Sequence, residues 1–257
     1  MIDNSKCKTK KNFLALFLLF ICSSISSAKA EEIILWDEVR LDGLDRTKSY
    51  KISSGTGFFV SDNIIATSQH VVTNCANIAI RGAVNPGKAK LIHENKEDDL
   101  ALLQSESSSP ALPRLRQNYS SIKQGDIIFT IGYPLDRSDS GLYILKEAKV
   151  INVKQGLNSP FSEIEFTDSV NHGNSGGPLL DANGNIIGVV KAKGSYINTQ
   201  TREEKIVGIG VGLDSLMAFL DKNKVNYSRT SSYDILTNYR NDQNAQKYIV
   251  NIHCVHE

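Results

Sequence analysis

The sequence has few cysteines, no internal repeat and nearly equal numbers of positively and negatively charged residues. Four of its 257 residues are cysteine, and the formal net charge at pH 7 is +1. A nearly neutral chain offers no basic surface, so we expect no nucleic-acid partner. No segment after residue 30 stays apolar over the roughly 20 residues that a membrane span needs, so we expect no stable membrane anchor.

The first thirty residues differ in composition from the rest. Four lysines lie within residues 6–11, an apolar run follows over 13–22, and small residues lead up to Ala30. This order is typical of a secretory signal peptide, and we expect cleavage after Ala30. The apolar run is too short to span a bilayer, and Ile21 before Cys22 does not suit a lipoprotein signal. The sequence therefore predicts export, to the periplasm or outside the cell.

Removal of residues 1–30 would take away five lysines and one aspartate, which changes the formal net charge from +1 to −3. Cys75 and Cys254 would be the remaining cysteines, either paired or as separate thiols. His253 and His256 flank Cys254, but on a strand only Cys254 and His256 would share a face. Because further zinc ligands are lacking nearby, we expect no metal and no cofactor.

The rest of the chain consists of short apolar runs separated by Gly, Asn, Asp, Pro and Ser, a pattern typical of an all-β barrel or sandwich. A stripe at Leu213, Leu216, Met217 and Leu220 predicts one helix, which uses its apolar face for core packing. The strands that we predict cover residues 55–60, 63–67, 77–81, 89–93, 100–104, 126–132, 144–153, 185–192 and 205–211.

Three segments follow from this pattern. Residues 1–30 are the signal peptide, residues 31–222 form the folded domain, and a Pro- and Ser-rich stretch near 110–125 divides that domain in two. Residues 223–257 are polar and too short for another sizeable domain. We expect them to be an extension, packed on the barrel or partly mobile, that the domain does not need for folding.

One segment has the composition of a nucleophile loop. Serine is a weak nucleophile at neutral pH and needs a nearby base, a group that orients the base, and N–H donors for the developing oxyanion. Ser175 is flanked by glycines on both sides, which allow close approach of a substrate. We predict Ser175 as the nucleophile and the backbone of Gly173, Asn174 and Ser175 as the oxyanion hole, although a flexible loop could have the same composition.

A base and an acid occur upstream in the chain. His70 follows two predicted strands, and Asp99 opens an apolar strand. Alone, each has a structural alternative, a satisfied histidine or a solvated strand end. Asp98 competes for the acid's role, but successive strand residues face opposite sides, so only one of the two can reach His70. We predict His70 as the base and one of these two aspartates as the acid.

The order His, Asp, Ser resembles the chymotrypsin-like proteases. Closer similarity to the HtrA/Deg-type trypsin-like peptidases is carried by five blocks: Gly-x-Gly-Phe from Gly55, Asp-Leu-Ala-Leu-Leu from Asp99, Gly-Asp-x-x-x-x-Ile-Gly-x-Pro from Gly125, Gly-Asn-Ser-Gly-Gly-Pro-Leu-Leu from Gly173, and Gly-Ile-Gly-Val from Gly208. The resemblance spans roughly residues 50–222 and implies two six-stranded antiparallel β-barrels with a C-terminal helix. It also selects Asp99 over Asp98.

The chain departs from the HtrA/Deg-type peptidases in its tail, and from animal proteases of this fold in its cysteine content. The tail is too short for the PDZ domain that usually follows such a protease, so we expect no PDZ-based substrate capture. Animal proteases of this fold usually carry several disulfides, whereas only two cysteines remain after residue 30. Two cysteines and a short signal suggest a bacterial export product.

The resemblance also implies a substrate-binding set. Ser169 falls near the base of the specificity pocket, and Val190, Lys191, Ala192 and Lys193 form the strand that pairs with the substrate backbone. Because Ser169 is not an acid, cleavage after basic residues is not expected, and the resemblance implies a preference for small or medium aliphatic P1 residues. Lys193 leaves an acidic P1 residue as the alternative.

The function predicted is therefore a serine endopeptidase that acts on proteins or peptides. The alternative is a catalytically silent relative that binds unfolded or partner proteins, since the fold can persist without the chemistry. An esterase of the α/β-hydrolase type would have the chain order Ser, acid, His and is excluded by the order found here.

Overall fold

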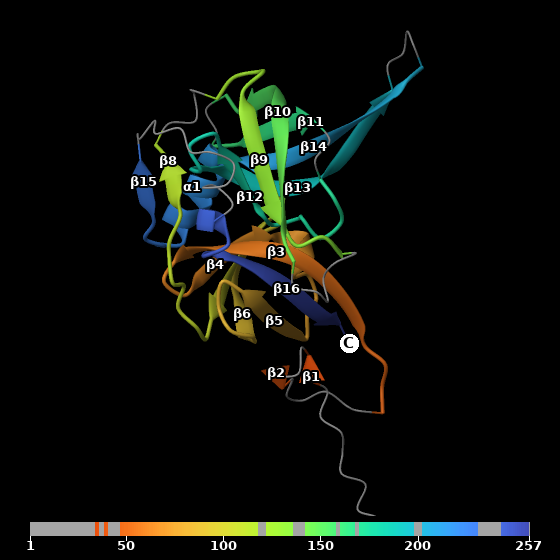
Figure 1. Ribbon diagram of the computed structural model, residues 1–257, viewed down its shortest axis with the longest axis vertical. Helices are drawn as coiled ribbons and strands as arrows, with labels where there is room; N and C mark the ends of the chain where they lie inside the picture. Colours follow the sequence, from red (N-terminus) through yellow and green to blue (C-terminus); the bar gives the residue numbers. More distant parts are fainter. Residues whose placement is uncertain are drawn as a thin grey trace, which may run out of the picture. The chain divides into compact units, whose positions relative to one another are not determined.

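A computed structural model describes residues 34–35, 39–40, 47–117, 122–135, 142–157, 160–167, 170–197, 202–230 and 243–256 (Figure 1). All of them belong to one compact unit, Glu32–Glu257. The predicted signal peptide lies outside the described residues. Strands β1 (Ile34–Leu35) and β2 (Val39–Arg40) form a small antiparallel pair.

Six strands close into the first barrel in the order β16-β3-β4-β7-β6-β5, and every pairing is antiparallel. Their bounds are Lys51–Ser61 for β3, Ile64–Ser68 for β4, Asn77–Gly82 for β5, Gly87–Asn95 for β6, Leu100–Ser105 for β7 and Ile249–His256 for β16. The C-terminal strand therefore completes the barrel built by the N-terminal half of the chain.

Six further strands form the second barrel in the order β12-β9-β10-β11-β14-β13, which a β12–β13 pairing closes. Their bounds are Ile127–Gly132 for β9, Ile144–Gln155 for β10, Ser162–Thr167 for β11, Pro178–Asp181 for β12, Ile186–Ile197 for β13 and Glu204–Gly212 for β14. Two short strands, β8 (Arg114–Arg116) and β15 (Ser228–Thr230), add parallel pairings beside β13. The prediction of two six-stranded antiparallel barrels is confirmed.

The predicted strands and helix have their physical basis in burial. Along β11 every second side chain is buried and those between are half-buried or exposed, whereas the middle of β3 is buried throughout. Phe58, Phe59 and Phe166 are among the largest fully buried side chains. Helix α1 (Leu213–Lys222) follows β14 directly and buries Leu213, Leu216 and Leu220, as its 3.6-residue stripe predicts.

Strand β16 is a strand of the first barrel, which differs from the expectation that residues 223–257 form an extension packed on it. Ile252 pairs with Gly55 of β3 on one side and with Ile80 of β5 on the other. The polar residues of this segment gave no indication that it lies in the core. Asn251 is fully buried, and its Oδ1 accepts a 2.9 Å hydrogen bond from Ser54 Oγ. A buried polar group that has a hydrogen-bond partner is tolerated in a core, which a hydropathy pattern cannot register.

Cys75 and Cys254 form a disulfide, with their Cα atoms 5.3 Å apart. The sequence alone did not decide whether these two cysteines form a disulfide or remain separate thiols. The bond joins the segment after His70 to β16, next to a 2.8 Å hydrogen bond from Ala76 N–H to the Val255 carbonyl oxygen. No described helix is long and apolar enough to cross a bilayer.

Candidate active site

His70 lies in a short 3-10 turn, Gln69–Val71, that begins where β4 ends. The turn can pack closely on β3 because Gly55 has no side chain: a Cβ there would overlap Val71. The imidazole of His70 is 49% exposed, so it faces the solvent side of the first barrel rather than its core. The histidine is therefore fixed at its backbone and accessible at its ring.

Asp99 contacts His70 twice. Its Oδ2 lies 2.8 Å from Nδ1 of the imidazole, and its Oδ1 accepts the backbone N–H of His70 at 2.9 Å. Its carbonyl oxygen accepts the N–H of Gln69 at 3.1 Å, and its φ of +55° turns the carboxylate toward the histidine just before β7 begins. Asp98 instead accepts a 2.7 Å hydrogen bond from Asn95 Nδ2. The structure thus brings Asp99, and not Asp98, to His70.

Ser175 lies in a loop that both barrels hold. Its carbonyl oxygen accepts the N–H of Thr56 from the first barrel at 2.9 Å, and Gly176 N–H donates to the Val190 carbonyl of the second barrel at 2.8 Å. Gly176 has a φ of +83°, and a Cβ there would overlap Thr67 and the Thr56 carbonyl. The hydroxyl of Ser175 donates to the Lys191 carbonyl oxygen at 3.3 Å.

Two backbone donors beside Ser175 are free. Within the part of the chain that the structure describes, no group accepts a hydrogen bond from the N–H of Gly173 or of Ser175. Asn174 differs, because its N–H donates to the Asn171 carbonyl at 3.0 Å and its side chain is fully buried. The predicted oxyanion set of three residues therefore reduces to two available donors, Gly173 and Ser175.

Thr56 organises this loop, and the sequence reasoning missed it. Its hydroxyl donates to the Gly173 carbonyl at 2.7 Å and accepts the N–H of Tyr133 at 2.9 Å. Its own carbonyl accepts the hydroxyl of Thr67 at 2.7 Å. The side chain is fully buried. A polar residue between two glycines in an apolar strand was the available signal, since a buried hydroxyl requires partners.

Four of the five predicted substrate-binding residues lie among the described residues, and they differ in position. Val190 is fully buried, so its side chain belongs to the core, and its carbonyl accepts the Ser68 hydroxyl at 3.0 Å. Lys191 occupies a β-bulge between Val190 and Ala192, which directs its carbonyl at Ser175. Ala192 and Lys193 pair with β14, with Lys193 opposite Gly208. Ser169 lies outside the described residues.

No group of three or more metal-ligating side chains occurs among the residues that the structure describes. Of the C-terminal candidates, Cys254 is in the disulfide, and His256 Nε2 lies 2.8 Å from Ser53 Oγ.

Comparison with known proteins places these residues within one family. The trypsin-like peptidase domain model matches residues 55–189, which include His70, Asp99 and Ser175. A probable periplasmic DegP-like serine endoprotease of Chlamydia pneumoniae is 35% identical over 188 residues, which is 68% of this chain and 34% of that protein. Serine protease HTRA1 of Xenopus tropicalis is 30% identical over 141 residues, 53% of this chain and 31% of that protein.

Solved structures show the same fold. The active form of the Rv3671c protease from M. tuberculosis superposes with a TM-score of 0.56 at 22% identity, covering 72% of this chain and 80% of that one. The chain spans about a third of the length of the two curated relatives. Since the family model covers more than half of its residues, the chain belongs to the trypsin-like peptidase domain family, with relatives among the HtrA- and DegP-type serine proteases.

Proposed function

We propose that this protein is an exported serine endopeptidase that uses Ser175, His70 and Asp99 as its catalytic triad. The observation that carries the proposal is the combination of the 2.8 Å contact between His70 and Asp99 with two unoccupied N–H donors beside the Ser175 hydroxyl. A base oriented by an acid and a preorganised pair of donors are the two requirements of serine-based acyl transfer.

In the proposed reaction Ser175 Oγ attacks the scissile carbonyl while His70 Nε2 takes the hydroxyl proton. Asp99 holds the proton on Nδ1 and stabilises the imidazolium that forms. The N–H groups of Gly173 and Ser175 bind the oxyanion. His70 then protonates the leaving amine, and a water activated by the same histidine hydrolyses the acyl-enzyme.

The Ser175 hydroxyl must turn before this reaction starts. It donates to the Lys191 carbonyl at 3.3 Å, and among the described contacts it has no hydrogen bond with His70. From Ala192 to Ile197, β13 pairs with β14 along one edge. A substrate strand that pairs along the other edge would take the Lys191 carbonyl as its acceptor and release the hydroxyl to His70. Substrate binding and activation of the nucleophile are then one event.

The proposed substrates are proteins or peptides in extended conformation, because pairing along a strand edge needs an extended backbone. Val190 adds no side-chain contact, since it is buried. Lys191 contributes its carbonyl, and Ala192 and Lys193 contribute the strand beside the P1 residue. We keep Ser169 as the proposed pocket base on the family resemblance.

Export to the periplasm or the extracellular space is the proposed location. The signal-like first thirty residues and the Cys75–Cys254 disulfide support it, because disulfides persist in oxidising compartments. The name of the Chlamydia pneumoniae relative includes a periplasmic location. Mass spectrometry of the exported protein should give Glu31 as the first residue, and retention of residues 1–30 would contradict export by a cleaved signal.

The decisive experiment is labelling of the purified mature protein with a fluorophosphonate. The probe should modify the wild type on Ser175 and should leave Ser175→Ala unlabelled. The bond between the Ser175 hydroxyl and Lys191 favours the second candidate, a silent member of the family that only binds proteins. A folded wild type that resists labelling, also in the presence of a protein substrate, would establish that candidate instead.

A further inference from the structure

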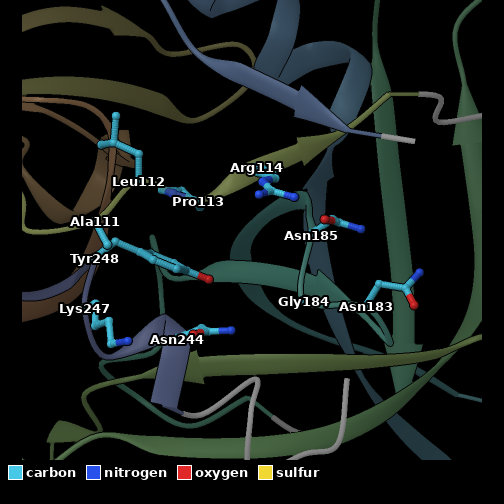
Figure 2. A pocket seen from close by; sticks show the side chains of 10 residues that line it. All are labelled: Ala111, Leu112, Pro113, Arg114, Asn183, Gly184, Asn185, Asn244, Lys247 and Tyr248. Atoms are coloured by element: carbon cyan, nitrogen blue, oxygen red, sulfur yellow. The ribbon is translucent and has the colours of Figure 1, made fainter. Parts of the chain in front are cut away.

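A cavity of about 370 Å³ lies on the molecule outside the proposed triad and shares no lining residue with it (Figure 2). Three separate segments line it, and it is open to solvent. They are the connection between the barrels at Ala111–Arg114, the β12–β13 turn at Asn183–Asn185, and residues Asn244, Lys247 and Tyr248 just before β16. Its volume falls in the range of small-molecule sites, roughly 300–1,000 Å³.

Two cations line this cavity without a counter-ion. Among the described residues, neither Arg114 nor Lys247 forms an ion pair through its side chain. The nearby carboxylate, Asp181, is already engaged: Arg116 Nη1 lies 3.4 Å away, and the N–H groups of Asn183 and Asn185 each donate to it at 2.9 Å. The cavity wall therefore carries an excess of positive charge that the surrounding carboxylate does not neutralise.

The side chain of Tyr248 adds a directed donor. Figure 2 shows its ring extending into the space between Arg114 and Asn244, with the hydroxyl at the far end. The residue is only 4% exposed, and no described group hydrogen-bonds this hydroxyl. Burial and the charge of Asp181 raise the pKa of Tyr248, so the hydroxyl stays protonated and can donate. A hydroxyl donor without a hydrogen-bond partner among the described residues, close to two cationic side chains, suits a bound anion.

Part of the wall is apolar. Leu112 and Pro113 line the cavity from the connection between the barrels, and the Tyr248 ring lines it from the C-terminal segment. A bare inorganic anion would leave these surfaces in contact with water, whereas an anion with a short hydrocarbon chain would cover them.

We propose that this cavity binds an organic anion, a carboxylate or a phosphate ester with a short apolar chain. Arg114 and Lys247 attract the head group, Tyr248 and Asn244 donate hydrogen bonds to it, and the chain packs on Leu112 and Pro113. The ligand would bridge both barrels and the segment that leads into β16. The proposal does not rest on the peptidase function, since it concerns binding at residues outside the triad.

The test is an NMR titration of the full mature chain carrying Ser175→Ala, which prevents self-cleavage from affecting the result. The probes are hexanoate, hexyl phosphate, inorganic phosphate and hexanol. Hexanoate or hexyl phosphate should shift the amide resonances of Gly184 and Lys247 until they saturate. The probe with the higher affinity identifies the head group. Inorganic phosphate and hexanol should bind more weakly, because each lacks one half of the ligand.

Three variants locate the site. Arg114→Gln, Lys247→Gln and Tyr248→Phe should each weaken binding of the preferred probe by about three- to tenfold, as loss of a charged or hydrogen-bonding group implies. Arg114 and Lys247 are exposed, so the first two variants should fold normally, which circular dichroism checks. Lys90→Gln, which removes an exposed lysine from β6, is the matched control and should bind as the parent does.

Several results would overturn the proposal. No saturable shift up to about 10 mM probe would exclude a useful site. Equal affinity for hexanol and hexanoate would show an apolar cavity without anion recognition. An equal loss of probe affinity in Lys90→Gln and in the cavity variants would show that the probe is attracted by surface charge in general and is not bound in the cavity.

Discussion

The hydroxyl of Thr56 in the first barrel donates a 2.7 Å hydrogen bond to the carbonyl of Gly173 in the second. The same oxygen accepts the N–H of Tyr133 at 2.9 Å. One buried side chain of β3 thus fixes the peptide next to the proposed oxyanion donors. The relationship crosses the interface of the two barrels, where the proposed site lies, and it makes the geometry of the nucleophile loop depend on how the barrels dock.

Thr56→Val should lower kcat by roughly 10- to 100-fold, because Gly173 loses the bond that orients its peptide. Unfolding should become easier by about 1–3 kcal/mol, the cost of leaving the Gly173 carbonyl and the Tyr133 N–H unpaired. Steady-state kinetics on a peptide substrate and urea denaturation measure the two effects. Thr56→Ser keeps the hydroxyl and should restore most of kcat. A Thr56→Val enzyme with wild-type kcat would contradict the positioning role.

The choice of acid is tested by a matched pair of substitutions. Asp99→Asn should lower kcat by roughly 10⁴-fold, because Asp99 can no longer hold His70 in the tautomer that accepts the Ser175 proton. Asp98→Asn should leave kcat within a few-fold of the wild type, since Asp98 contacts Asn95 and not His70. Steady-state kinetics of both variants identify the acid. A wild-type kcat in Asp99→Asn would show that His70 is oriented by another group.

Truncation after Tyr248, which removes β16, should abolish soluble folding. The strand supplies fully buried Ile249, Val250 and Ile252 and pairs with β3 and β5 on its two edges, so its loss opens the first barrel. Solubility, circular dichroism and thermal unfolding are the measurements. Removal of Glu257 alone is the matched control and should have no effect, because β16 ends at His256. A soluble truncated protein with a cooperative thermal transition would refute this assignment.

Replacement of both cysteines, Cys75→Ala with Cys254→Ala, should lower the free energy of unfolding by about 2–5 kcal/mol, the usual cost of losing a native disulfide. Because the bond links residues 179 positions apart, it constrains the unfolded chain strongly. Denaturant titration gives the free energy, and maleimide labelling of the unfolded wild type without reductant counts free thiols. Two free thiols in the exported wild type would disprove the disulfide.

A peptide-library profile tests the specificity pocket. The expected P1 preference is for small or medium aliphatic residues, as the family resemblance implies. Lys193, exposed and opposite Gly208, gives the alternative of an acidic P1 residue. A profile led by Glu and abolished by Lys193→Ala would establish the alternative, because an exposed ammonium would then supply the selectivity. Dominance of Arg or Lys at P1 would remove Ser169 as the pocket base.

The residues that carry the proposed chemistry were predicted from local signals together with the family resemblance, which chose Asp99 over Asp98. A nucleophile loop needs glycines around Ser175, and strand ends near His70 and Asp99 show as breaks in short apolar runs. The helix from Leu213 was equally readable, since its 3.6-residue stripe lies within one stretch of chain. Period and composition are local properties, and the sequence by itself determined the elements that depend on them.

The tertiary structure alone decided the long-range pairings. Nothing within Ile249–His256 shows that it belongs between β3 and β5, because its neighbours lie about 170 to 200 residues earlier in the chain and its buried Asn251 looks polar in isolation. The pairing of Cys75 with Cys254, the burial of Val190 and the bonds of Thr56 follow from that same assembly. Each depends on which surfaces meet when the barrels close, and burial and hydrogen-bond satisfaction exist only once they have met.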